Sequence, residues 1–167
     1  LYYHIGHMLV MRNSLGATTF VFDNDGYKDF ARTYIGAETK ERIHRLLIRY
    51  FTTEGVYQSV RALDELPHAY LELKEYGELY RLLNDMTFCQ RMVSNGLGET
   101  LIDYVRILSK ELTGDQAAQT YLRDLYRFLV KEIDVLIKYA KFDKSIFTKK
   151  FNAFLAEHTD NLQNRYH

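Results

Sequence analysis

The fold is decided by the stretch from Glu38 to Met92, which contains ETKERIHRLLIRYF (38–51), SVRALDELPHAYL (59–71) and YRLLNDMTF (80–88). In the first of these segments, apolar residues recur at the spacing of one helical stripe: Ile43, Leu46, Leu47, Tyr50 and Phe51. Two further stripes follow: Val60, Leu63, Pro67, Tyr70, Leu71 and Lys74, then Leu79, Leu82, Leu83 and Met86. Short amphipathic helices cannot bury a face alone, so we expect them to pack on one another. This indicates an architecture and no activity.

The packing of these stripes predicts near-complete burial for six leucines. They are Leu46, Leu47, Leu63, Leu71, Leu82 and Leu83. Pro67, the single proline, should kink or start a helix because it lacks a backbone donor. Gly77 is expected to divide two antiparallel helices, which would give a helical hairpin of the size of a tetratricopeptide (TPR) repeat.

Upstream of this stretch, the sequence favours one β-hairpin. Met8–Arg12 and Ala17–Phe22 have strand composition, and Asn13–Gly16 between them has turn composition. A two-stranded hairpin is marginal alone, so it must lean on helices. Asp23 and Asn24 are candidate caps for the following helix. That helix should reach about Tyr34 and bury Tyr27, Phe30, Ala31 and Tyr34.

Downstream, residues 94–98 (SNGLG) are the most loop-like segment and the best candidate boundary. Three more helices are predicted after it. The first carries Leu101, Ile102, Val105, Leu108 and Leu112; the second, long helix carries Ala118, Leu122, Leu125, Leu129, Ile133, Leu136 and Ala140; the last carries Phe147, Phe151, Phe154 and Leu155. The fold class predicted is therefore mainly α, with one β-hairpin followed by a helical arm.

Composition excludes several classes of protein. The 167 residues include 22 basic and 22 acidic ones, so no global field attracts nucleic acid or an anionic membrane. No apolar run approaches the roughly 20 residues of a membrane span. Cys89 is the single cysteine, which rules out an internal disulfide and permits a reducing, cytoplasmic location. Because the chain begins at Leu1, we expect it to lie inside a larger polypeptide.

Patterns that carry chemistry are weak, and we assign no catalytic, cofactor-binding or metal-binding residue. His4 and His7 could share one helix face, yet no third ligand is near them in sequence. Gly96–Gly98 lacks the lysine of a phosphate-binding loop. Five lysines give the end of the chain a basic character, which Asp143 interrupts: Lys138, Lys141, Lys144, Lys149 and Lys150. A solvated helix face explains them better than a nucleic-acid site.

Aromatic residues supply the one candidate binding surface. The chain has 14 tyrosines and 10 phenylalanines, and tyrosine is favoured at protein interfaces. Four aromatic residues surround more than one side of the long helix: Tyr121, Tyr126, Phe128 and Tyr139. A helix that is apolar on more than one face is either enclosed or in contact with a partner, and the sequence favours neither reading.

The order HRLLxxYF (44–51), RxLxELPH (61–68) and LNDMTF (83–88) resembles a segment of NACHT-type and related STAND nucleoside triphosphatases, over residues 8 to 92. There a winged helix passes into a helical, TPR-like arm. The resemblance implies a winged-helix segment over 1–55 with the hairpin as its wing, a TPR-like hairpin over 56–93 and a helical arm over 94–167. It also implies a non-catalytic part of a large scaffold that acts through protein contacts, with the cilium or a ribonucleoprotein particle as possible settings. A nucleic-acid-binding winged helix and an unrecognised enzyme stay open as alternatives.

The same resemblance bears on nucleotide binding. STAND winged helices carry a triplet similar to Met-His-Asp, whose histidine contacts a nucleotide phosphate, and the matching triplet here is Val21-Phe22-Asp23. Phe22 offers no donor to a phosphate, so we expect the segment to serve as architecture, with no cofactor.

Overall fold

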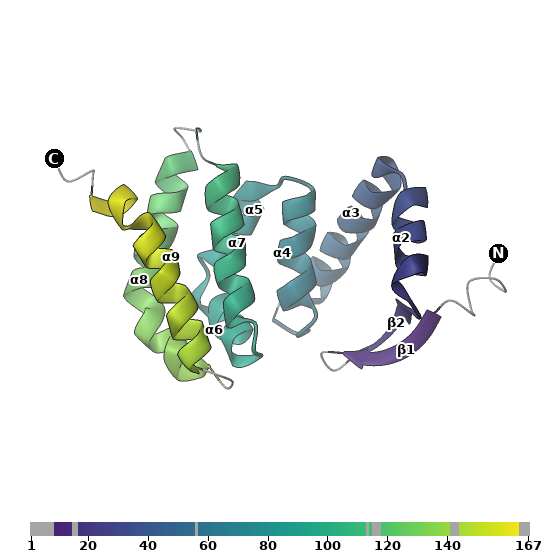
Figure 1. Cartoon of the computed structure of the whole chain (residues 1–167), viewed down its shortest axis with the longest axis horizontal. Helices are drawn as coiled ribbons and strands as arrows, with labels where there is room; N and C mark the ends of the chain where they lie inside the picture. Colours follow the sequence, from purple (N-terminus) through teal and green to yellow (C-terminus); the bar gives the residue numbers. More distant parts are fainter. Residues whose placement is uncertain are drawn as a thin grey trace.

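The computed structural model describes residues 9–14, 17–55, 57–112, 114, 118–140 and 144–163. The elements in chain order are β1 (Leu9–Ser14), β2 (Ala17–Phe22), α2 (Asp25–Tyr34), α3 (Ala37–Glu54), α4 (Ala62–Glu72), α5 (Tyr76–Leu83), α6 (Met86–Ser94), α7 (Gly98–Glu111), α8 (Ala118–Tyr139) and α9 (Lys144–Gln163). The helices follow one another along the molecule, with the hairpin and α2 at one end and α8 and α9 at the other (Figure 1). The predicted order of one β-hairpin followed by helices is confirmed.

β1 and β2 form an antiparallel hairpin whose register runs from the pair Leu9 and Phe22 to the pair Ser14 and Ala17. Across it, the Thr18 hydroxyl donates a hydrogen bond to the side-chain oxygen of Asn13 at 2.9 Å. β1 therefore continues through Asn13 and Ser14, which the sequence had placed in the turn. Met8, the predicted start of this strand, lies outside the described residues.

Helix α2 begins where its capping residue predicts. The side chain of Asn24, and not that of Asp23, accepts a hydrogen bond from the backbone N–H of Tyr27 at 3.0 Å. The helix ends at Tyr34, as expected. Its predicted burial is wrong, because no residue of α2 is buried and only Ala31 is half-covered. The reason is that few residues of α3 lie against its apolar face.

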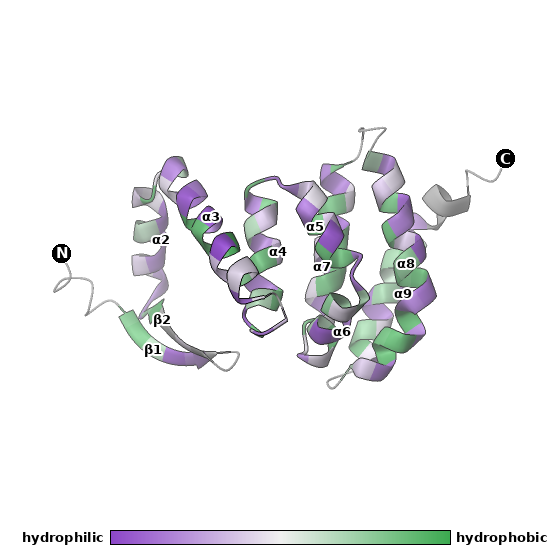
Figure 2. Cartoon of the chain, turned by 180° about the vertical axis from the view of Figure 1, so that it is seen from behind, coloured by the Kyte–Doolittle hydropathy of each residue, from purple (hydrophilic) through white to green (hydrophobic). Residues whose placement is uncertain are grey.

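A continuous hydrophobic core runs through helices α3 to α9, from Phe51 to Phe154. α3 packs on α4, and the last four helices interleave, because α6 contacts α8 and α7 contacts α9. Hydrophobic residues recur along each of these helices (Figure 2), and the buried ones pack into this single core. Residues 95–97 are therefore a turn between packed helices, and the same core continues on both sides of the candidate boundary at 94–98.

The turn between α4 and α5 lies at Lys74, three residues before the glycine expected to form it. Lys74 has φ +58°, the Glu75 N–H donates to the Tyr70 carbonyl at 2.9 Å, and the Lys74 N–H donates to that of Leu71 at 3.0 Å. This is a Schellman motif with lysine in the left-handed position, where glycine is usual. Gly77 is the second residue of α5. Pro67 lies inside α4, which begins five residues before it.

The six leucines predicted to be buried fall into three groups. Leu63 and Leu83 are fully buried. Leu47, Leu71 and Leu82 are only half-buried against the core, so near-complete burial is wrong for them. Leu46 is 57% exposed, so the prediction is wrong for it. The apolar stripe on α3 is wider than the face that α4 covers. Leu46 lies at the edge of the stripe that α4 leaves uncovered.

Candidate protein-binding surface

Helix α3 has two apolar faces, of which one is covered. His44, Leu47, Ile48 and Phe51 lie on the side that packs against α4 and the core. Ile43, Leu46 and Tyr50 lie on the other side, and all three are exposed. Leu46 and Leu47 are neighbours in sequence, and a helix turns by about 100° per residue, so they point to different sides. The outward residues are the ones that α4 leaves uncovered.

Helix α2 adds a second uncovered apolar face. Phe30 and Tyr34 stack with their ring centroids 4.3 Å apart, and they are 57% and 75% exposed. Tyr27 lies on the same face and is 37% exposed. With about 200 Å² for a fully exposed aromatic residue, these three residues on one face of α2 leave roughly 340 Å² in water. Contiguous apolar patches above a few hundred Å² mark interaction sites. We call Tyr27, Phe30, Tyr34, Ile43, Leu46 and Tyr50 the outward surface of α2 and α3.

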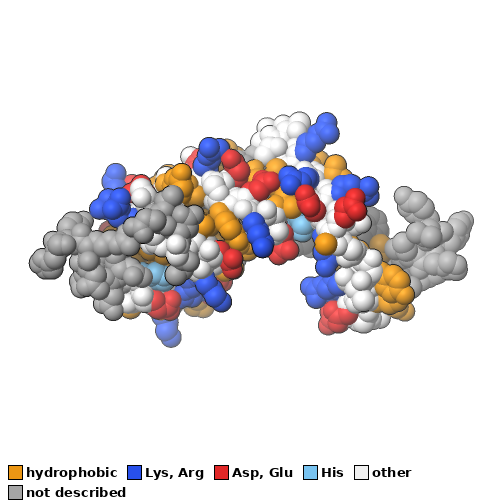
Figure 3. Space-filling view, turned by 90° about the horizontal axis from the view of Figure 1, so that it is seen from above, with side chains coloured by type: hydrophobic (Ala, Val, Ile, Leu, Met, Phe, Trp, Pro, Cys, Tyr) orange, Lys and Arg blue, Asp and Glu red, His pale blue; other side chains and the backbone are white. Residues whose placement is uncertain are grey.

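Near this surface, some arginines of α3 form ion pairs within the described ranges and others do not. Arg45 bonds to Glu41 at 3.0 Å and to Glu75 at 3.2 Å, which ties α3 to the turn before α5. Both carboxylates, that of Glu41 first, raise the pKa of Arg45. Arg42 and Arg49 lie on the same helix, and neither forms an ion pair with any residue that the structure describes. Seen from above, hydrophobic side chains interrupt the charged surface in the middle and at the N-terminal end of the molecule (Figure 3).

The four aromatic residues predicted on α8 do not form one surface. Tyr121 is 50% exposed, with its ring 5.0 Å from that of Tyr80 on α5, and Tyr139 is exposed at the far end of the helix. Phe128 is half-buried against the core. Tyr126 is 6% exposed, so it does not lie on a surface that a partner could reach.

Tyr126 is instead part of a cluster between α7, α8 and α9. Its hydroxyl is hydrogen-bonded to that of Ser109, and its ring meets the rings of Phe154 and His158 at centroid distances of 5.4 Å and 5.2 Å. Burial raises the pKa of Tyr126, and the Ser109 hydrogen bond opposes this shift in part. This residue has a structural role, because its one polar atom is satisfied inside the protein.

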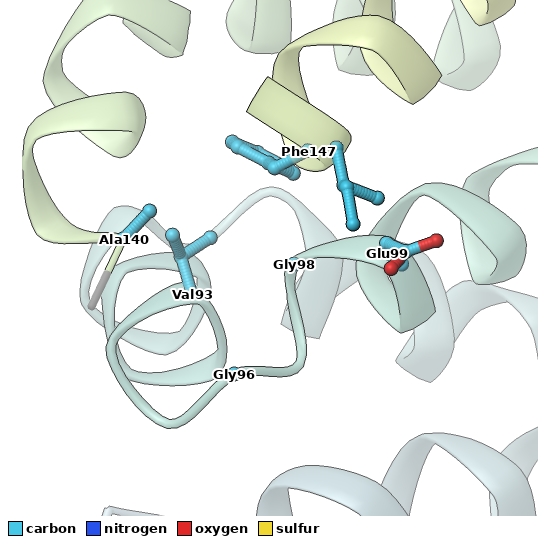
Figure 4. A pocket seen from close by; sticks show the side chains of 7 residues that line it. Val93, Gly96, Gly98, Glu99, Ala140 and Phe147 are labelled. Atoms are coloured by element: carbon cyan, nitrogen blue, oxygen red, sulfur yellow. The ribbon is translucent and has the colours of Figure 1, made fainter. Parts of the chain in front are cut away.

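A small hollow lies where α9 begins, and it is too small for a cofactor. Val93, Gly96, Gly98, Glu99, Ala140, Ile146 and Phe147 line a volume of about 110 Å³ (Figure 4). Ligand pockets usually enclose about 300–1,000 Å³. The Phe147 ring lies against Gly98 at the start of α7, where a Cβ atom would come within 2.8 Å of it. The hollow is therefore a feature of close helix packing.

Cys89 has no nucleophilic character in this structure. It is fully buried, and its thiol is hydrogen-bonded to the Leu83 carbonyl at 3.2 Å. Burial, and secondarily the charge of Asp85, raise the pKa of Cys89 to about 12. The thiol therefore stays protonated near neutral pH, whereas a nucleophile must be a thiolate.

The structure also places the candidate metal and nucleic-acid residues. Among the described residues, no three His, Cys, Asp or Glu side chains lie close enough to hold a metal. His4 and His7 lie outside those residues, as does Lys141. Lys150 bonds to Asp103 at 2.7 Å, so its charge is compensated. Lys138, Lys144 and Lys149 are exposed.

The outward surface of α2 and α3 was missed because its residues had been assigned to the core. The available signal was that α3 carries apolar residues around more of its circumference than one neighbouring helix can cover.

Within the described part of the chain, no helix has both the length and the apolar character to cross a membrane. The chain matches no known protein family, no curated protein and no solved structure.

Proposed function

We propose that this chain is a non-catalytic segment of a large STAND-like scaffold protein and that it acts through protein–protein contacts. The outward surface of α2 and α3 is its docking site, and the occupant is an α-helix of a partner protein. One observation carries the proposal: α2 is strongly amphipathic, yet none of its residues is buried. An amphipathic helix gains its stability by covering its apolar face, so such a face indicates a missing neighbour.

Several features support a helix as the occupant. Four of the six residues of the outward surface are aromatic, and aromatic residues are enriched at the centres of interfaces. They lie on helices at helical spacing, which is the geometry that receives another helix in a groove or bundle. The STAND resemblance, which rests on the sequence motifs between residues 44 and 88, stays a part of the proposal.

Site-specific photo-crosslinking tests this function. A photoreactive amino acid is placed at Leu46, and at Val130 as a control, because Val130 is also exposed but lies on α8. The full-length protein is then crosslinked in its native cells. We expect the Leu46 probe to capture one defined helical segment that the Val130 probe does not capture.

The captured segment must then bind the purified chain as a synthetic peptide. Leu46→Asp should abolish this binding, and Val130→Asp should leave it unchanged. The proposal would be contradicted if both probes captured the same segments. It would also be contradicted if Leu46→Asp left the affinity for the peptide unchanged.

A further inference from the structure

The outward residues of α3 follow the spacing of a coiled-coil seam. Thr39, Ile43, Leu46, Tyr50 and Thr53 are separated in turn by four, three, four and three positions. This alternation is the a/d pattern of a heptad, which forms a narrow stripe that a second helix can cover. Ile43, Leu46 and Tyr50 in its middle are exposed and span two helical turns, about 10.5 Å. We call these five residues the α3 seam.

Two uncompensated arginines border one edge of the seam. With Ile43 and Tyr50 at a positions, Arg42 and Arg49 occupy the preceding g positions, seven residues apart. Both are exposed, and neither pairs with an acidic group among the described residues. Arg45 lies further around the helix, where Glu41 and Glu75 already compensate it. The edge therefore presents two positive charges spaced to match one face of another helix.

The opposite edge of the seam offers no comparable charge pattern. It is formed by Lys40, Leu47 and Glu54 at the e positions. Leu47 packs against the core, and the carboxylate of Glu54 lies near the hydroxyl of Tyr50, whose pKa it raises. A partner helix therefore meets a consistent charge only on the arginine side.

We propose that the α3 seam binds an amphipathic helix that carries acidic residues seven positions apart along one edge of its apolar stripe. This inference rests on the proposed function and adds the chemistry of the partner. The apolar seam supplies the affinity, because exposed ion pairs contribute little by themselves. The arginines select the partner, since charges at the rim of an interface act chiefly on specificity and on the association rate. Arg42 and Arg49 can each hold a carboxylate through two parallel hydrogen bonds.

Two designed peptides of three heptads serve as probes. Both have leucine at every a and d position; the acidic peptide has glutamate at every e and g position, and the basic peptide has lysine there. Like charges at these positions discourage each peptide from pairing with itself. Fluorescence anisotropy measures the binding of each labelled peptide to the whole chain at low and at high salt.

Charge-reversal variants test the effect of the two arginines separately from that of the apolar seam. We expect wild type to bind the acidic peptide at least tenfold more tightly than the basic one, with a preference that weakens at high salt. The double variant Arg42→Glu/Arg49→Glu should reverse the preference. Lys110→Glu/Lys138→Glu makes the same charge change at exposed positions on α7 and α8 and should preserve it. Circular dichroism confirms that each variant is folded.

The results distinguish a failure of the acidic-partner inference from a failure of the proposed function on which it rests. Equal binding of both peptides, no binding of the acidic peptide, or a preference that survives the arginine reversal overturns the acidic partner and leaves the docking surface standing. Acidic-peptide binding that Leu46→Asp does not weaken overturns the docking surface itself, and the proposed function with it.

Discussion

Replacing Gly98 by alanine should destabilise the chain by about 1–2 kcal/mol. Gly98 is the first residue of α7, and an added Cβ would lie 2.8 Å from Cδ2 and 3.2 Å from Cε2 of Phe147. The Phe147 ring is buried, so it cannot move aside cheaply. An added group that clashes with a buried ring forces side-chain or backbone shifts, which cost about 1–3 kcal/mol. Against this, replacing glycine removes freedom from the unfolded chain, which stabilises by about 0.4–1 kcal/mol.

Gly77→Ala is the matched control. Gly77 lies inside α5, its φ is not positive, and apart from its chain neighbours and the backbone of its own helix no atom lies within 4 Å of the position that a Cβ would take. The same substitution there should therefore stabilise the chain by about 0.4–1 kcal/mol. The two substitutions should change the free energy of unfolding in opposite directions, because only the Cβ added at position 98 meets the ring of Phe147.

Urea unfolding followed by circular dichroism measures both effects, and a double-mutant cycle identifies their cause. In a Phe147→Ala background the ring is gone, so Gly98→Ala should become neutral or stabilising. The coupling free energy between the two substitutions should exceed about 1 kcal/mol. If Gly98→Ala stabilises wild type as Gly77→Ala does, or costs the same with and without the ring, the close packing of α9 on α7 is refuted.

Three further predictions concern single residues. Leu47→Ala should lower the free energy of unfolding by about 1–3 kcal/mol, whereas Leu46→Ala should change it by less than about 0.5 kcal/mol; equal losses in urea unfolding would contradict the two-faced α3. Lys74→Gly should stabilise the chain by about 0.5–1 kcal/mol, because glycine adopts the left-handed conformation without strain; a lower melting temperature would argue against the Schellman turn. Cys89 holds its proton in the folded state up to a pKa of about 12, against 9.0 ordinarily, so the stability that it contributes is complete below pH 9 and is lost as the pH rises through 12. Unfolding measured across that window should show a smaller loss in Cys89→Ala, and an identical loss would refute the buried thiol.

Local features of this fold could be predicted from the sequence because neighbouring residues determine them. The hairpin was visible in strand composition on either side of a short polar break, and among the described residues only the end of its first strand, Asn13 and Ser14, was misplaced. Asn24 caps α2 through its own side chain and the backbone three residues later. The stripes of α7, α8 and α9 were correct for the same reason, since Leu101, Leu125 and Phe151 are each buried where helical periodicity places them.

Features that depend on distant residues could not be predicted. Leu46 and Leu47 belong to one broad stripe, and only the position of α4 decides which of them is covered. Tyr121 and Tyr126 are both tyrosines of α8, yet only Tyr126 is buried, because α9 packs against its ring and Ser109 of α7 satisfies its hydroxyl. The turn at Lys74 was missed because its two hydrogen bonds stabilise a conformation that lysine rarely adopts.

The hairpin and α2 place no described side chain in the core, and amide hydrogen exchange should register this as a gradient along the molecule. An amide exchanges when its hydrogen bond opens, and opening is easiest where few apolar contacts are lost. Amides of β2 and α2 should therefore exchange through local opening, while those of α7, surrounded by buried side chains on both sides, should wait for global unfolding. A helix bound across α2 and α3 would slow exchange at this end of the chain and leave α7 unchanged, so the protection pattern alone would reveal where the partner lies.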